Sequence, residues 1–438
     1  MKKFHGILIC ALIVNAWLLC SPEKAYAQGS TWAGESLQQM VEAARWKFGL
    51  LRVNAALELT NAGYDSDVYY GYQDDPVPDF TLAAGVPIQV LIPASKTVVL
   101  DIYDYPQYVF YLDTERERGW NNTFRGQLHI ALEKFYIQAG GGLANVRQRL
   151  SPELDVNYRL KTNSLDGLVL WQVSRQTSLA MVYGGADYDY GDDEFGGTSY
   201  AETMNRKENI VDLVAYLQPN PRVRFFLDGQ YGTYAFKEEV ASERDAQSYG
   251  VFGGFEFIPR EGELVPATRV QGRLSLGYMW FDMKDPQFVD GSGLAGTASL
   301  SAEILRRTTV RGFFTRGYQF SILSGASYYI GTNYGGGISR ALSRRASISY
   351  DLTLGHTDYP EVEGGGGAPA GYPNRYTTHM GGLNIQLTRL LSVTFLATFA
   401  RRVMDEDGLA RNRNFIGLSL VYGYLPARMS TPVSGMPR

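Results

Sequence analysis

The chain has 438 residues and a slightly acidic formal net charge of −4, which argues against a nucleic-acid partner. Its only two cysteines, Cys10 and Cys20, lie near the N-terminus, so the rest of the chain forms neither disulfides nor thiolate metal sites. After the first 27 residues, no apolar stretch is long enough for a transmembrane helix. No linker divides the chain into domains. A soluble all-β protein and a β-barrel that crosses a membrane remain as the candidate classes.

Residues 1–27 have the three parts of a cleavable secretory signal peptide. Two lysines are followed by an apolar run over about residues 7–19, and Ala25-Tyr26-Ala27 ends the segment in small-x-small form. We therefore predict export from the cytoplasm and cleavage after Ala27. Cys20 offers a lipoprotein alternative, which Leu19 disfavours because lipoprotein processing prefers a small residue before the cysteine.

Residues 28–47 form an N-terminal segment that we expect to be periplasmic. Leu37, Met40, Val41, Ala44 and Trp46 have the spacing of one helix face, which predicts a short amphipathic helix within residues 31–47. A surface helix is the favoured interpretation, and a helix inside a barrel mouth is the alternative.

From residue 48 to residue 425, apolar and polar residues alternate, which is typical of strands with one apolar face. The segments run for about ten residues or more, as tilted membrane-spanning strands require, whereas ordinary strands average about five or six. Aromatic residues gather near segment ends, as in the girdles of membrane barrels: Tyr278, Trp280, Phe281, Tyr422 and Tyr424.

Short and long connections alternate along the chain, as in bacterial barrels with short periplasmic turns and longer extracellular loops. The segments number about eighteen, within an expected range of 16–18, and their centres lie near Ala55, Ile88, Leu100, Leu128, Ile137, Leu168, Met181, Leu213, Phe225, Phe255, Leu276, Ala298, Gly312, Gly331, Tyr350, Leu383, Phe395 and Leu420. We therefore predict an all-β fold, a transmembrane antiparallel up-and-down barrel over residues 48–425. Residues 426–438 would form a C-terminal tail.

If the apolar face meets lipid, the polar positions between the apolar ones face the lumen. The candidate lumen-lining residues are Arg125, Gln127, His129, Arg224, Asp228, Gln230, Arg269, Gln271, Arg273, Asp351, Tyr103 and Tyr105. Such rows could bind sugar hydroxyls or set ion preference, or opposite charges could pair across strands and stiffen the wall. The arginines in these rows suggest an anionic substrate, and the two tyrosines could stack on sugar rings or simply pack.

No catalytic or metal-binding constellation is apparent. The three histidines beyond the signal peptide lie on separate predicted strands without metal-ligand spacing. The acidic stretch from Asp187 to Glu194 departs from the EF-hand pattern, so a solvated loop is favoured over a Ca²⁺ site. We expect a protein that is not an enzyme and that uses no metal or cofactor.

Three segments carry a resemblance to the putative β-barrel porin 2 family, over about residues 50–424. Residues 61–69, Asn-Ala-Gly-Tyr-Asp-Ser-Asp-Val-Tyr, resemble the family's loop after the first strand, with Asp67 where Asn is usual. Residues 120–124 resemble a strand opening, and residues 306–311 with the tyrosines that follow resemble a late hairpin. Members are outer-membrane barrels often encoded beside exopolysaccharide synthesis genes. The resemblance implies polymer secretion or outer-membrane permeation.

The expected function is therefore a conduit in a Gram-negative outer membrane for an exopolysaccharide or capsular polysaccharide. Its expected partners are the polymer, a periplasmic polysaccharide-export protein and outer-membrane lipids. A general or solute-specific diffusion porin is one alternative, and an outer-membrane hydrolase or adhesin is another. Lipid-facing and subunit-facing strands look alike in sequence, so any oligomeric state is compatible with the pattern.

Overall fold

The computed structural model describes residues 30–69, 76–148, 157–191, 194–195, 198–220, 222–257, 269–305, 307–322, 326–359, 373–404 and 410–424. The predicted signal peptide, its cleavage position after Ala27 and the predicted tail over residues 426–438 lie outside the described residues.

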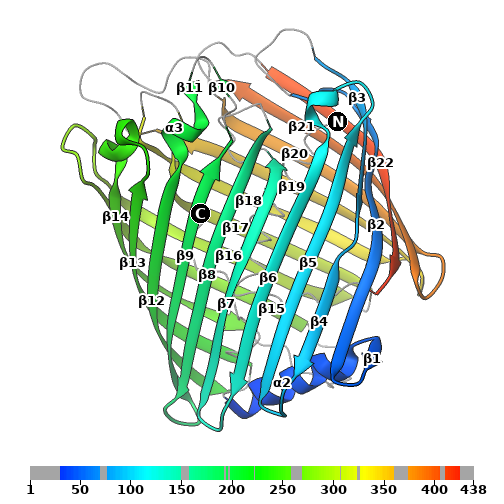
Figure 1. Cartoon of the computed structure of the whole chain (residues 1–438), viewed down its shortest axis with the longest axis vertical. Coiled ribbons are helices and arrows are strands. Elements are labelled where there is room, and N and C mark those ends of the chain that lie inside the picture. Colours follow the sequence, from blue (N-terminus) through cyan, green and yellow to red (C-terminus); the bar gives the residue numbers. More distant parts are fainter. Residues whose placement is uncertain are drawn as a thin grey trace.

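Nearly every element is a strand (Figure 1). The strands are β1 (Trp46–Phe48), β2 (Leu51–Asp65), β3 (Asp79–Gly85), β4 (Ile88–Pro93), β5 (Val98–Tyr111), β6 (Gly119–Ala131), β7 (Phe135–Gln148), β8 (Tyr158–Gln172), β9 (Thr177–Tyr190), β10 (Glu194–Phe195), β11 (Thr198–Ser199), β12 (Arg206–Asn220), β13 (Val223–Phe236), β14 (Ala246–Phe257), β15 (Arg269–Met283), β16 (Gly291–Leu305), β17 (Thr308–Phe320), β18 (Tyr328–Ala341), β19 (Ala346–Asp358), β20 (Pro373–Gln386), β21 (Leu391–Met404) and β22 (Ala410–Gly423). The helical elements are α2 (Ser30–Ala43), α3 (Tyr200–Met204) and the 3₁₀ turns η2 (Glu115–Glu117) and η3 (Glu239–Arg244).

The long strands form one closed antiparallel barrel of eighteen strands, as predicted. Each strand pairs with the next along the chain, and β2 closes the ring by pairing with β22. β3 and β4 together make one barrel strand, because both pair with β2 on one side and with β5 on the other. All eighteen predicted centres fall within strands.

A proline interrupts the second barrel strand between β3 and β4. Pro87 has no N–H to donate to the ladder, and a proline inside a sheet is confined to edges or irregular positions. Backbone groups around the break still form hydrogen bonds with both neighbouring strands. Val86 N–H donates to the Pro106 carbonyl (3.0 Å), and the Pro87 carbonyl accepts from Ala56 N–H (3.2 Å). The alternation of residues alone could not reveal this break.

Side chains on the wall alternate between the outer and the inner face. On β13, Leu227 is 60% exposed and its neighbour Asp228 only 4%.

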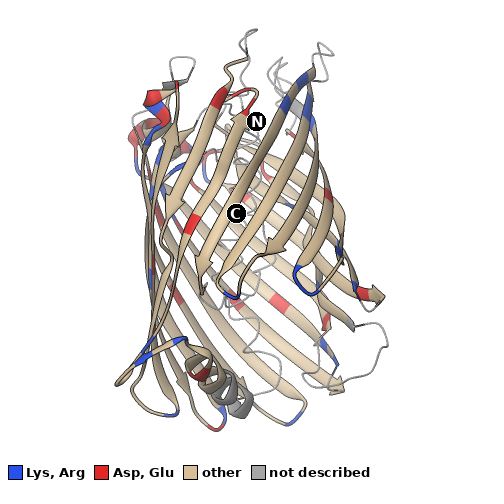
Figure 2. Ribbon diagram, turned by 90° about the vertical axis from the view of Figure 1, so that its right-hand side faces the viewer, with Lys and Arg blue, Asp and Glu red and all other residues tan. Residues whose placement is uncertain are grey.

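Lys and Arg gather near the two rims, with long uncharged stretches of strand between them (Figure 2). Tyr278 and Trp280 lie outward, as expected of a girdle, whereas Phe281 is buried on the inner side, so its assignment to the girdle was wrong.

The short turns and α2 lie at the same end of the barrel, and the long connections lie at the other (Figure 1). We refer to these as the short-turn end and the long-loop end. The loop expected over residues 61–69 begins later, because β2 continues to Asp65. The segment after α2 and the end of β22 meet at the short-turn end, where the Arg45 guanidinium carbon lies 4.8 Å from the centre of the Tyr424 ring.

A buried ion pair fastens the seam between β2 and β22 at the long-loop end. Arg413 Nε and Nη2 donate to the two carboxylate oxygens of Asp65, at 3.1 and 2.9 Å. Both side chains are almost fully buried, at 1% and 0% exposure. Such bidentate pairs are geometrically demanding, so this contact fixes the register in which the first and last strands meet.

We predict that Arg413→Met destabilises the barrel by about 3–5 kcal/mol, because it leaves the Asp65 carboxylate buried without its cation. The measurement is the urea midpoint of the barrel reconstituted in lipid vesicles. The double variant Asp65→Asn, Arg413→Met should lose much less stability, since it strands no charge. Equal urea midpoints for the wild-type protein and Arg413→Met would contradict a stabilising role of this ion pair between β2 and β22.

Candidate functional site

The inner wall carries most of the side chains that the sequence predicted to face the lumen. Gln127 and His129 on β6, Arg224, Asp228 and Gln230 on β13, Arg273 on β15 and Asp351 on β19 are buried, while their apolar strand neighbours Leu128, Phe225, Leu227 and Tyr350 are exposed. Arg125, Tyr103 and Tyr105 are half-buried, and Gln271 is exposed. Arg269 begins β15, and its side chain is outside the described set. Their role in transport remains a prediction.

One polar network runs across β2, β4 and β5. The Asn54 amide donates to Gln89 (3.3 Å), and Gln89 Nε2 donates to both carboxylate oxygens of Asp101 (3.1 and 3.0 Å). Closer to the long-loop end, the Tyr105 hydroxyl donates to Glu58 (2.7 Å). Tyr105 is therefore held by a carboxylate across the break between β3 and β4, which favours a packing role over a free stacking surface.

A second network crosses β6, β7 and β8 and depends on a glycine. Gln127 and Gln138 both donate to Asp166 Oδ2, at 2.9 and 3.2 Å. Gln127 and Asp166 lie two strands apart, on either side of Gly140. A Cβ on Gly140 would lie 2.7 Å from Gln127 Cγ, so only glycine leaves room for this contact. On the same face, His129 Nδ1 lies 2.8 Å from the Tyr136 hydroxyl.

The third network links β12, β13, β14 and β15. Gln230 donates to Asp212 (2.7 Å), and Arg224 pairs with Glu256 directly across the ladder. The Arg224 guanidinium carbon lies 4.4 Å from the centre of the Tyr216 ring. Arg273 lies 4.0 Å from the centre of the Phe226 ring. Charge pairing and cation–π contact thus fix both arginines against the wall.

Asp351 forms a separate contact that reaches across a glycine, as the contact between Gln127 and Asp166 does. Arg311 Nε donates to Asp351 Oδ1 (2.7 Å), and the two residues flank Gly337 across three strands. A Cβ at Gly337 would collide with the Asp351 carboxylate. The Arg311 side chain is 52% exposed, so this pair keeps a cation accessible inside the barrel.

The predicted residues therefore form separate networks instead of converging on one site, and their carboxylate partners were missed. Asp166 and Glu256 stand beside glycine or aromatic residues, and Asp212 stands among aliphatic residues, so the contrast between the two strand faces is weak at all three positions. An inward-facing glycine between two polar strand positions is the signal that could have identified such partners.

Helix α2 lies in the barrel mouth at the short-turn end. Leu37 is 2% exposed and packs in a cluster with inner-wall residues that include Leu91, Val99 and Tyr136. Gln38 Nε2 also donates to the Lys96 carbonyl in the turn between β4 and β5 (3.3 Å). The predicted amphipathic helix exists, but its apolar face is buried against the inner wall, not on an outer surface.

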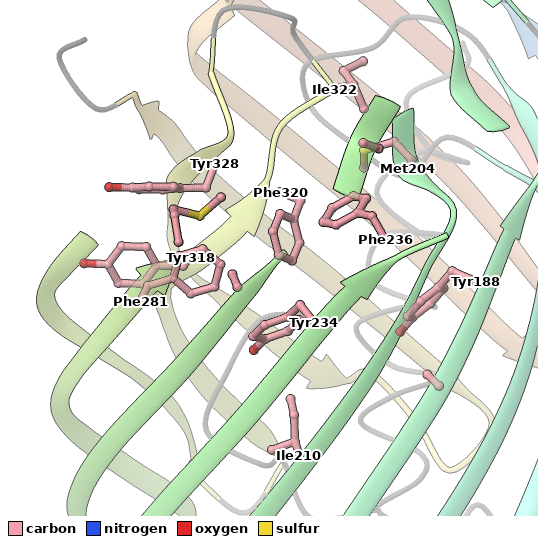
Figure 3. Close-up of a cluster of buried hydrophobic side chains, with 14 of the residues drawn as sticks. Tyr188, Met204, Ile210, Tyr234, Phe236, Phe281, Tyr318, Phe320, Ile322 and Tyr328 are labelled. Atoms are coloured by element: carbon pink, nitrogen blue, oxygen red, sulfur yellow. The ribbon is translucent and has the colours of Figure 1, made fainter. Parts of the chain in front are cut away.

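An aromatic cluster narrows the inside of the barrel near the long-loop end (Figure 3). Phe281 stacks on Tyr318 at 5.4 Å between ring centres, and Tyr234 and Phe236 each contact Phe320 edge-on at 5.2 and 5.0 Å. Arg206 lies within this cluster, 4.8 Å from the centre of the Tyr188 ring. Interlocked rings of this kind form a rigid inner ledge.

Arg244, in η3, joins three connections above the aromatic ledge. Its Nη1 donates to the Thr203 carbonyl in α3 (3.0 Å), and its Nη2 donates to the carbonyls of Ser321 and Ser327. Its guanidinium carbon also lies 5.1 Å from the centre of the Phe236 ring. One side chain therefore holds the connections after β9, β13 and β17 together.

The described residues offer no sign of a metal centre. Within the described ranges, no group of three or more His, Cys, Asp or Glu is arranged to hold a metal ion. Two members of the predicted acidic stretch, Asp187 and Asp189, form ion pairs with Lys237, while Asp192 and Asp193 lie outside the described residues. No helix in the described part of the chain is long and apolar enough to span a membrane.

Solved barrels provide distant structural neighbours. OccAB4 of Acinetobacter baumannii aligns with a TM-score of 0.46 and 12% identity over 85% of this chain and 97% of that chain. OpdO of Pseudomonas aeruginosa aligns with a TM-score of 0.45 and 13% identity, over 85% and 96%. A bacterial polysaccharide outer membrane secretin aligns with a TM-score of 0.36 and 10% identity, over 85% and 98%. Such low similarity carries no information about what crosses the barrel.

Sequence comparison is more decisive about the family. No curated protein matches the chain. Residues 159–422, which are more than half of the chain, match the family model described as putative beta-barrel porin 2. The chain therefore belongs to the putative beta-barrel porin 2 family, and it is a porin-like β-barrel of the outer membrane.

Proposed function

We propose that the barrel is a conduit through which an exopolysaccharide or capsular polysaccharide crosses the outer membrane. The observation that carries this proposal is the inner wall, where amide side chains donate to carboxylates and where Arg224 and Arg311 pair with acidic residues. The reported association of the family with exopolysaccharide synthesis genes agrees with it.

A polysaccharide offers hydroxyl groups that both donate and accept hydrogen bonds. Amide side chains such as Gln127, Gln138 and Gln230 have the same dual capacity. Paired charges create little net field, so such a wall would not trap the polymer by attraction. Arginines alone suggested an anionic substrate, but Glu256 and Asp351 lie beside Arg224 and Arg311, so the charge balance does not favour that narrower prediction.

The two mouths favour a controlled conduit over an always-open pore. Helix α2 occupies one mouth through Leu37, and Arg244 joins three connections at the other. In the proposed function, a periplasmic polysaccharide-export protein engages the short-turn end and displaces α2 as the polymer arrives.

Deletion of the gene should abolish surface polysaccharide and leave the uptake of small solutes unchanged, because the barrel would serve one polymer. Polymer is measured by surface carbohydrate staining, and uptake by the rate of entry of a labelled sugar. Re-expression of the full chain is the control. Unchanged polymer together with slower solute uptake would instead identify a diffusion porin.

Leu37→Asp should raise the conductance of the purified barrel in planar bilayers. A carboxylate buried without a partner costs several kcal/mol, which would drive α2 out of the mouth. Gln39→Asp is the matched control, because it places the same charge on the exposed face of the same helix. If both variants conduct like the wild-type barrel, α2 does not limit permeation.

Arg244→Ala should loosen the long-loop mouth by removing charge-assisted hydrogen bonds, each worth about 1.5–3 kcal/mol. We expect faster proteolysis within residues 198–204 and 321–327 and larger current fluctuations. Arg345→Ala, an exposed arginine in a short turn at the other end, should change neither. If Arg244→Ala is cleaved no faster than the wild-type protein, Arg244 is not the residue that holds these connections.

A further inference from the structure

A groove of about 440 Å³ crosses the outer wall over β6, β7, β8, β9 and β12. It lies on the lipid-facing side, because its lining includes Leu143 and Leu165, which are 57% and 59% exposed beside inward-facing neighbours. Its volume is within the range of about 300–1,000 Å³ that is typical of ligand sites. Its position towards the long-loop end corresponds to the outer leaflet in the expected orientation.

The groove exists because one row of the wall consists mostly of glycine. Strand pairing aligns Gly126, Gly141, Leu165, Gly185 and Asn209 directly across the five strands. Three of these five positions are glycine, so the backbone forms the floor. Over Gly185, the Tyr183 hydroxyl donates to Asn209 Oδ1 (2.8 Å), which forms one polar edge.

The groove changes from apolar to polar across the strands, from β6 and β7 towards β9 and β12. The adjoining row towards the long-loop end aligns Phe124, Leu143, Asn163, Asp187 and Lys207. The row beyond it includes Lys161, paired in register with Asn145 and Asp189. An occupant would therefore contact hydrocarbon side chains at one end and amides and lysines at the other.

The charges at the polar end leave a local excess of cations. Lys237 forms ion pairs with both Asp187 and Asp189, which neutralises much of the acidity nearby. Within the described part of the chain, neither Lys161 nor Lys207 has an ion-pair partner. Both lysines are exposed. Lysines near a membrane surface attract anionic headgroups with about 1 kcal/mol each.

We propose that this groove binds a phosphorylated glycolipid of the outer leaflet. An acyl chain would lie over the glycine floor between Phe124, Leu143 and Leu165. Sugar hydroxyls would meet Asn163 and Asn209, and a phosphate would meet Lys161 and Lys207. This site is separate from the inner wall, so it does not depend on what the barrel transports.

The test is native mass spectrometry of the full barrel in detergent, with a bis-phosphorylated glycolipid and its dephosphorylated form as probes. Lys161→Gln combined with Lys207→Gln should lower the retention of the phosphorylated probe by roughly fivefold for each lysine removed. Arg401→Gln is the matched control, an exposed cation on β21. It should leave retention unchanged.

A second variant fills the groove without altering charge. Gly126 borders the groove, because it pairs with the lining residue Gly141. A Cβ on Gly126 meets no atom within 4 Å, so Gly126→Leu should fold normally and extend its side chain over the floor. Gly381→Leu is its control, because Gly381 is equally open and pairs with the outward Tyr350 on a distant part of the wall. We expect Gly126→Leu alone to weaken retention of both probes.

Three results would overturn the proposal. The first is equal retention of the phosphorylated probe by the wild-type barrel and the double lysine variant. The second is equal retention of the phosphorylated and dephosphorylated probes by the wild-type barrel. The third is a wild-type dimer that Gly126→Leu dissociates while lipid retention stays the same, which would make the groove a contact between two copies of the chain.

Discussion

The hydrogen-bonding demand of the backbone inside hydrocarbon is the constraint on which this structure depends. Lipid offers no partner for an unpaired N–H or C=O, so a sheet that crosses the membrane must close on itself. Here closure joins β2 to β22, and the buried pair of Asp65 and Arg413 holds the seam. Once the ring is closed, the alternation along each strand decides which side chains face lipid and which face inward.

The sequence predicted the strands well because alternation is a local property that each strand carries by itself. It predicted the inner wall less well, because contacts there join residues far apart in the chain. Gln127 meets Asp166, and Arg311 meets Asp351, only where a glycine on the middle strand leaves space. Helix α2 was predicted as a helix, but its position depends on a cluster that exists only after closure.

These glycine-spanning contacts hold charged side chains in fixed positions on the inner wall of a wide barrel. Neighbouring strands lie about 4.8 Å apart, so a contact across a glycine reaches over about 10 Å of wall. Each such contact ties three strands together with one pair of side chains. The wall gains stiffness at both positions, and the charges of Arg311 and Asp351 also offset each other. Both effects suit a passage for a polar and bulky polymer.

The contact of Arg45 with Tyr424 has a consequence for protein engineering. An even number of antiparallel strands returns the backbone to the side from which it started, so residues 30 and 424 share one rim. A reporter domain fused beyond either residue would remain in the same compartment. The opposite rim is built entirely from connections between strands, so an epitope displayed there must be inserted into a loop and tethered at both of its ends.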